Sequence, residues 1–73
     1  MSHGQNNPRK YVKLIRLAND LRQADLASAV GISGQKISRI ERGVMTPPRE
    51  IAQKIANTLG KDIATLFPEV LND

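Results

Sequence analysis

Cysteine and tryptophan are absent from this 73-residue sequence, and histidine, tyrosine and phenylalanine occur once each. Without cysteine the chain cannot form disulfides, iron–sulfur clusters or thiolate zinc sites. The single histidine, His3, excludes a site with several histidine ligands. Long apolar runs are also missing, and no charged-then-apolar leader opens the sequence. We therefore expect a cytoplasmic protein with no metal, no cofactor and no membrane contact.

Length limits what the chain can do by itself. A domain of this size buries only ~60% of the surface that its unfolded chain exposes. Its core rarely contributes more than ~3–5 kcal/mol. We therefore expect one small domain that gains stability from a second copy or from a partner.

Positive charge is concentrated in the first two thirds of the chain. The net charge is +4, but residues 9–49 carry nine of the eleven lysines and arginines against three acids. Residues 50–73 carry two bases and four acids. A polyanion should therefore prefer the first part, which leaves the last third for another role.

The periodicity of the apolar residues predicts a chain of short helices. Residues 1–8 are small and polar and are predicted to form a flexible N-terminal arm. Beyond them, apolar residues recur at three- and four-residue steps, and no segment alternates as a strand does. The predicted helices cover about 9–20, 23–30, 34–42 and 47–59, followed by a short fifth helix after Asp62. We expect an all-α, five-helix domain over 9–68 and a C-terminal tail over 69–73.

Local signals fix several of these helix ends. Gly31 stands where a helix ends in a left-handed residue, and Ser33 offers a hydroxyl N-cap to the next helix. Thr46 is predicted to cap the fourth helix, with the two prolines after it in the first turn. Tyr11 is predicted to lie in the core, and Val44 to extend the apolar stripe of the third helix.

Only three residues, Gly31-Ile32-Ser33, join the second predicted helix to the third. So short a link forces a sharp bend and is typical of a helix-turn-helix unit, whose second helix can enter the major groove of DNA. A helix that lies in the groove must be polar and free of acids on its outer face. The third helix meets this condition, since Glu41, its only acid, lies beside its apolar stripe.

From Ile15 to Phe67 the chain resembles the Cro/repressor (XRE-type) helix-turn-helix family. The resemblance implies an all-α, five-helix domain that binds double-stranded DNA, commonly as a dimer on palindromic operators, and regulates transcription. It rests on the order and spacing of these pieces: Ile15-Arg16, Leu21-Arg22-Gln23, Leu26-Ala27, Gly31-Ile32-Ser33, Ile37-Ser38-Arg39-Ile40-Glu41-Arg42-Gly43, Pro47, Ile55-Ala56, Leu59-Gly60 and Leu66-Phe67.

The resemblance also implies roles for single residues. Positions that meet base edges in the family are held here by Gln35, Ser38 and Arg39. Glutamine suits adenine and arginine suits guanine, each with ~1–3 kcal/mol of discrimination. The positions for contacts to the DNA backbone are held by Gln23, Ser33, Lys36 and Arg42.

Two further positions follow from the resemblance. Arg16 and Glu41 match a structural ion pair between the first helix and the end of the third. Gly34 departs from the family, because many members have a glutamine, arginine or threonine at this position, which is the first of the helix to contact bases. Either fewer residues read bases here, or the backbone approaches the DNA more closely. Contact with the DNA backbone and simple solvation stay equally open for Arg9, Lys10 and Lys13.

The C-terminal residues Phe67, Val70 and Leu71 are expected to form a dimer interface, because they are apolar and follow a core that is already closed. The alternative is that Phe67 and Leu71 fold back on the first and fourth helices of their own chain. Pro68 should turn this segment into an extended strap. The expected protein is therefore a homodimeric transcriptional repressor without a small-molecule ligand. An antitoxin or protein-interaction module with the same fold is the alternative. The sequence contains no catalytic grouping and no phosphate loop, so we do not expect an enzyme.

Overall fold

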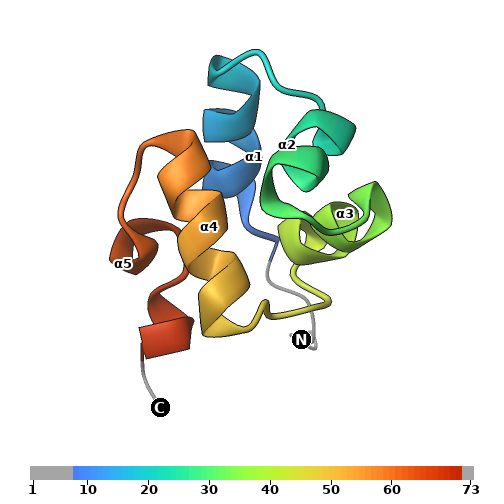
Figure 1. The fold of residues 1–73 in the computed structure, drawn as a ribbon. Coiled ribbons are helices and arrows are strands. Elements are labelled where there is room, and N and C mark those ends of the chain that lie inside the picture. Colours follow the sequence, from blue (N-terminus) through green and yellow to red (C-terminus); the bar gives the residue numbers. More distant parts are fainter. Residues whose placement is uncertain (1–7, 72–73) are drawn as a thin grey trace.

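The computed structural model describes residues 8–71, and every regular element in that range is helical (Figure 1). The predicted all-α class with five helices is confirmed. In this range, no helix combines the length and apolarity that a membrane span requires. The predicted arm lies outside the described residues except for Pro8. The elements are α1 (Lys10–Ala18), α2 (Gln23–Val30), α3 (Gly34–Arg42), α4 (Arg49–Leu59), α5 (Ile63–Leu66) and the 3-10 helix η1 (Pro68–Leu71).

The helices α2 and α3 have the predicted bounds because local signals define both of their ends. The chain turns at Gly31 with φ +89°, a conformation that only glycine adopts at low cost. The Oγ atom of Ser33 then accepts a hydrogen bond of 3.1 Å from the backbone N–H of Lys36. At the start of α2, Asp25 accepts from the backbone N–H of Arg22 at 2.9 Å.

The start of α4 differs from the prediction. Thr46 does not cap this helix; Pro48 is its N-cap residue, with ψ 156°. A residue that precedes a proline is pushed out of helical geometry, so Pro47 stays outside the helix, and it is buried. The first intrahelical bond therefore runs from the N–H of Ala52 to the carbonyl of Pro48, at 2.9 Å.

A single apolar core joins all of these elements. In Figure 1, α4 lies at the front between α5 and the α2–α3 pair, and it packs against α2, α5 and η1. Phe67, from the residue after α5, has no exposed surface. The core consists of Val12, Leu26, Ala27, Val30, Ile37, Ile40, Ala52, Ile55, Ala56, Leu59, Leu66, Phe67 and Val70.

Two residues predicted to face inward are exposed instead. Tyr11 is 44% exposed, because its neighbour Val12 takes the inward position of α1. Val44 is 47% exposed, because the chain leaves the helix axis at Gly43, where φ is +79°. The inward stripe of α3 therefore ends with Ile40.

The C-terminal segment is a helical turn and not the predicted extended strap. Pro68 ends α5, but the chain continues as η1 and packs against α4 and α5. This turn buries Val70 at 7% exposure, and Phe67 before it is fully buried. Both belong to the core of the protomer, so of the three residues expected in a dimer interface only Leu71, at 38%, keeps exposed surface.

Candidate nucleic-acid interface

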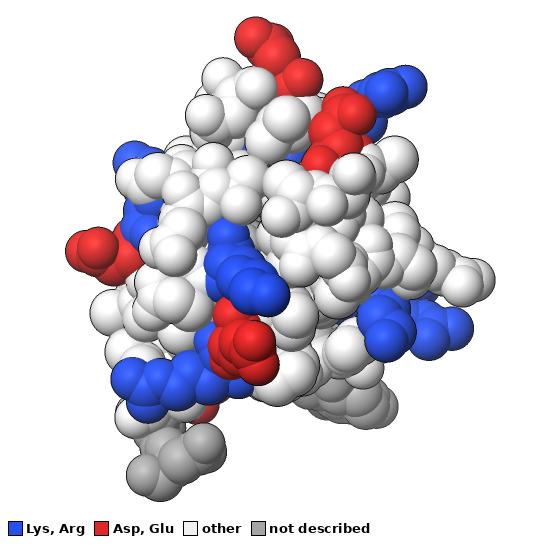
Figure 2. All heavy atoms as spheres, viewed as in Figure 1, with Lys and Arg blue, Asp and Glu red and all other residues white. Residues whose placement is uncertain are grey.

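The outer face of α3 presents polar and basic side chains to solvent. Gln35, Lys36, Arg39 and Arg42 are exposed, and Ser38 is half-buried. Among the described residues, none of these three cations forms an ion pair with an acid. Figure 2 shows basic atoms without acidic neighbours on the side of the molecule where α3 lies, whereas both signs alternate over the front. This face can therefore accept an anion without first breaking an internal ion pair.

Gly34 opens α3 at a close approach to α2. A Cβ atom at this position would lie 3.8 Å from the Cα atom of Ala24, an ordinary contact distance. The residue therefore sits against the partner helix, and packing leaves room for a methyl group. The glycine that the fold demands in this turn is Gly31, whose φ is positive.

A buried ion pair ties α3 to α1. The Nε atom of Arg16 lies 2.5 Å from one Glu41 oxygen, and its Nη2 atom lies 3.1 Å from the other. Both side chains are about 5% exposed or less. A third bond joins Arg16 to the carbonyl of Leu21 at 2.7 Å. The guanidinium thus fixes the end of α1, the turn after it and the last turn of α3 relative to one another.

Gln23 belongs to the same network. Its amide donates a hydrogen bond of 3.2 Å to Glu41, from the first turn of α2 to α3. Its side chain therefore braces α3 and is half-buried, with part of its surface still open to solvent.

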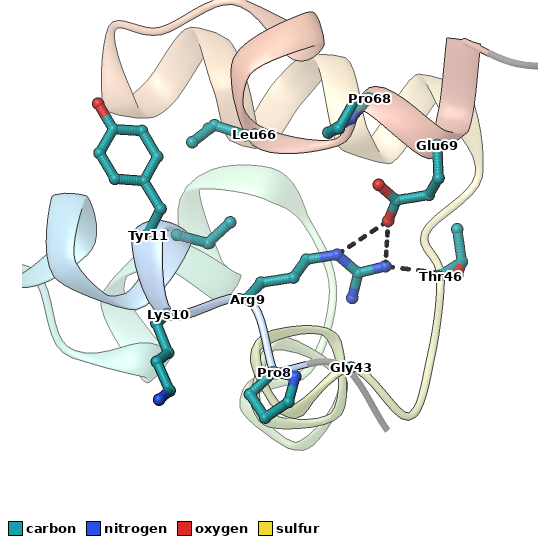
Figure 3. Close-up of a pocket in the computed structure, with 10 residues that line it drawn as sticks. Pro8, Arg9, Lys10, Tyr11, Gly43, Thr46, Leu66, Pro68 and Glu69 are labelled. Carbon is teal, nitrogen blue, oxygen red and sulfur yellow. Dashed lines mark hydrogen bonds and ion pairs between the residues drawn. The ribbon is translucent and has the colours of Figure 1, made fainter. Parts of the chain in front are cut away.

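Arg9 forms a second clamp at the same C-terminal end of α3, which we call the Arg9 clamp. Figure 3 shows its side chain reaching from the start of α1 to Glu69 and Thr46. It donates to the carbonyls of Ile40 at 2.5 Å and Met45 at 3.0 Å, and it forms an ion pair with Glu69. The backbone N–H of Arg9 also donates to the carbonyl of Glu41, at 2.7 Å.

The Arg9 clamp is a structural feature that sequence reasoning missed. Its guanidinium lies 5.4 Å from the centre of the Phe67 ring, and only 12% of the side chain is exposed. In the sequence Arg9 is one of several nearby cations, and nothing local separates it from Lys10. Only the carbonyls and Glu69, which come from distant parts of the chain, define its role.

Electrostatics at this clamp favour the ionised carboxyl. Burial raises the pKa of Glu69, but the hydrogen bond from Arg9, a backbone hydrogen bond at Glu69 and the positive charge of Arg9 outweigh it and hold that pKa below its ordinary value. A surface hollow of about 630 Å³ surrounds the pair. Arg9 and Glu69 neutralise each other in this hollow, and Lys10 is the remaining charged residue that lines it.

Comparison with known proteins places this geometry in a family. A profile described as "Helix-turn-helix" matches residues 12–66, which is most of the chain. The chain belongs to the XRE-type helix-turn-helix family. That family consists of DNA-binding transcription regulators and is not a class of enzymes.

Two relatives show how far the likeness of this helix-turn-helix protein extends. An uncharacterized HTH-type transcriptional regulator of Methanocaldococcus jannaschii is 39% identical over 56 residues, which are 77% of this chain and 85% of that protein. One of Mycobacterium tuberculosis (strain ATCC 25618 / H37Rv) is 39% identical over 49 residues, 67% of this chain. The match covers only 19% of the length of the mycobacterial relative.

The residues predicted to contact DNA lie on α2, on α3 or in the turn that joins them. Ser33 is exposed at the first turn of α3, although its hydroxyl already accepts the capping bond from Lys36. Arg16 and Glu41 are in direct contact in the interior. Phe67 and Val70 lie in the core.

Proposed function

We propose that this helix-turn-helix protein represses transcription by binding a palindromic operator as a homodimer. The observation that carries the proposal is the outer face of α3, where the exposed cations have no acidic partner among the described residues. An α-helix with its side chains fits the major groove, which is ~12 Å wide. A protein bound there blocks polymerase without needing a further domain.

The proposed contacts divide into two kinds. Gln35, Ser38 and Arg39 read base edges from the outer face of α3. Contacts to phosphate come from Gln23, Ser33, Lys36 and Arg42, which position the helix without reading sequence. Lys36 and Arg42, used twice in a dimer, neutralise four phosphates and give a log–log salt slope of about −3.6.

Selection of bound fragments from random DNA, followed by titration of variants, tests this proposal. Arg39→Ala should cost ~1–3 kcal/mol on the selected site and relax preference at one base pair per half-site. Lys36→Ala, the matched control, should weaken binding to all sequences alike and flatten the salt slope. The assignment of α3 as the reading helix fails if Arg39→Ala leaves the sequence preference unchanged.

A protein-interaction module or antitoxin is the second candidate, and one observation favours it. Tyr11, Leu14 and Leu17 project from α1 with 44%, 61% and 52% of their surface exposed. Exposed apolar residues that cluster on one helix mark a protein contact more often than isolated ones do. A random-DNA selection that recovers no preferred sequence, with a small toxin-like reading frame beside the gene, would favour this candidate.

A further inference from the structure

A second hollow, of about 380 Å³, lies between the start of α1 and the side of α3. Lys10 and Lys13 line it from α1, and Ser38 and Arg42 line it from α3. Gln23, from the first turn of α2, lies on the same rim. Three elements that the Arg16 and Arg9 contacts hold together thus enclose one basic hollow.

The charges of this hollow are unbalanced toward the positive. Arg9 and Glu41 also line it, but each is already paired, with Glu69 and Arg16 respectively. Lys10, Lys13 and Arg42 remain, and none has an acidic partner among residues 8–71. Three like charges around one hollow repel each other, and an anion placed between them relieves that repulsion.

The position of the hollow indicates which anion fits. Ser38 belongs both to this rim and to the outer face of α3, so the hollow lies directly beside the face proposed to read bases. A helix in the major groove is flanked by the phosphates of the strand that borders the groove. An anion carried by the duplex therefore reaches the hollow when α3 docks.

We propose that this hollow binds a phosphate of the DNA backbone, with Lys10 and Lys13 as contacts that α1 adds to the helix-turn-helix unit. The inference rests on the proposed function. The three basic residues at the start of α1 then have two different roles. Lys10 and Lys13 face the DNA, whereas Arg9, beside them in sequence, is turned inward and releases no counterions on binding.

The salt dependence of binding to a non-specific duplex tests the inference. Neutralising one phosphate changes the slope of log K against log salt by about 0.9. Lys10→Gln and Lys13→Gln, which share one phosphate, should each flatten the slope by part of that amount per bound protomer, and the double variant should flatten it by about the whole amount. Lys61→Gln is the matched control and should leave the slope unchanged, because this exposed lysine belongs to the segment between α4 and α5, which Figure 1 shows on the side of α4 away from α3. Circular dichroism should show all of these variants folded.

The same variants separate failure of this inference from failure of the proposed function. If wild type binds DNA and Arg39→Ala alters its sequence preference, but neither lysine variant flattens the slope, the hollow is not a phosphate site. If wild type binds no duplex, the proposed function fails first. NMR titration at constant ionic strength distinguishes the source of the phosphate: Lys10 and Lys13 resonances should shift with duplex and not with inorganic phosphate. Equal shifts with inorganic phosphate alone overturn the assignment to DNA.

Discussion

Side chains of the same charge take opposite roles within five residues at the start of α1. Arg9 is largely buried and bonds to carbonyls at the end of α3, whereas Lys10 and Lys13 are exposed. A guanidinium can do this because it carries five donors in a fixed plane, while an ammonium is a strongly hydrated point charge.

Gly34 is the residue where the sequence departs from its family and the structure shows why a side chain would fit. Gly34→Ala should raise the free energy of unfolding by about 0.4–1 kcal/mol, because alanine restricts the unfolded chain and its Cβ meets no clash. Urea denaturation measures the change. Gly31→Ala is the control and should destabilise, since its φ is +89°. A loss of stability in Gly34→Ala would mean that α2 and α3 pack more tightly than described.

The Arg16–Glu41 pair predicts strong coupling between two substitutions. Removing either partner leaves a buried charge uncompensated and should cost about 3–5 kcal/mol. Replacing both, with Arg16→Met and Glu41→Gln, should cost less than the sum of the single changes. A double-mutant cycle from urea unfolding at low temperature checks this. Strictly additive losses would contradict a direct interaction.

At the scale of the helices, the helix-turn-helix unit is the part that the sequence predicts to the residue. Its ends depend on short-range signals, namely the glycine in the turn and the serine cap, which act whatever the rest of the chain does. The start of α4 was predicted wrongly because two consecutive prolines exert competing effects. One suits the first turn of a helix, but the second pushes the residue before it out of helical geometry.

Two features could not be predicted from local signals: the Arg9 clamp, and the burial of Phe67 and Val70 in the core of their own chain. Both depend on contacts between residues far apart in sequence. Arg9 meets Glu69 across 60 positions, and no local pattern reports that distance. The apolar cluster at the C-terminus was recognised correctly, but periodicity does not say whether it covers its own core or a neighbour.

Glu69, on the 3-10 helix η1, should make the free energy of unfolding sensitive to acid. Glu69 has a lower pKa in the folded chain than in the unfolded one, so the folded state binds fewer protons there. The stabilisation is present above the ordinary pKa of 4.5 and is lost as the pH falls through the lower, folded value. Glu69→Gln should therefore flatten the fall in melting temperature below about pH 4.5.

The melting temperature of Glu69→Gln should still fall in part, because Asp25 also stabilises the folded state at neutral pH and loses that effect in acid. The hydrogen bond from Arg22 lowers the pKa of Asp25 at the start of α2. Asp25→Asn is therefore the matched comparison for Glu69→Gln. If Glu69→Gln followed the same acid profile as wild type, the pair with Arg9 would contribute no stability in solution.

At the scale of the whole molecule, the basic first part of the chain and its acidic last third contribute different parts of the structure. Among residues 8–71, five of the seven basic residues without an acidic partner lie on α1 and α3, and the other two, Arg49 and Lys61, lie at the start of α4 and just after its end. The acidic third contributes α4, α5 and much of the core. In the proposed homodimer, both copies of α3 must face the same side of the duplex, ~34 Å apart, which is one helical turn. The second copy therefore has to join beside the α3 face and not opposite it.

Leu71 provides the test of that dimer, since it alone of the three C-terminal apolar residues is exposed. Leu71→Glu should shift sedimentation toward the monomer and weaken binding to a full palindrome more than to a half-site. Leu14→Glu, on α1, is the comparison. If Leu14→Glu gives monomers and Leu71→Glu does not, copies meet through α1 and not through the C-terminal segment.

The contact between Arg9 and Glu69 also bears on the order in which the chain folds. The helices α2 and α3 meet across a three-residue turn, whereas this pair closes a loop of 60 positions, and the entropy lost on closure grows with loop length. Local contacts form first and distant ones late, so α2 and α3 should pack together before η1 packs against the rest of the domain. We therefore expect the contact that forms last, between Arg9 and Glu69, to open first in the native protein. Hydrogen exchange should therefore detect release of η1 in a state where the helix-turn-helix unit is still protected.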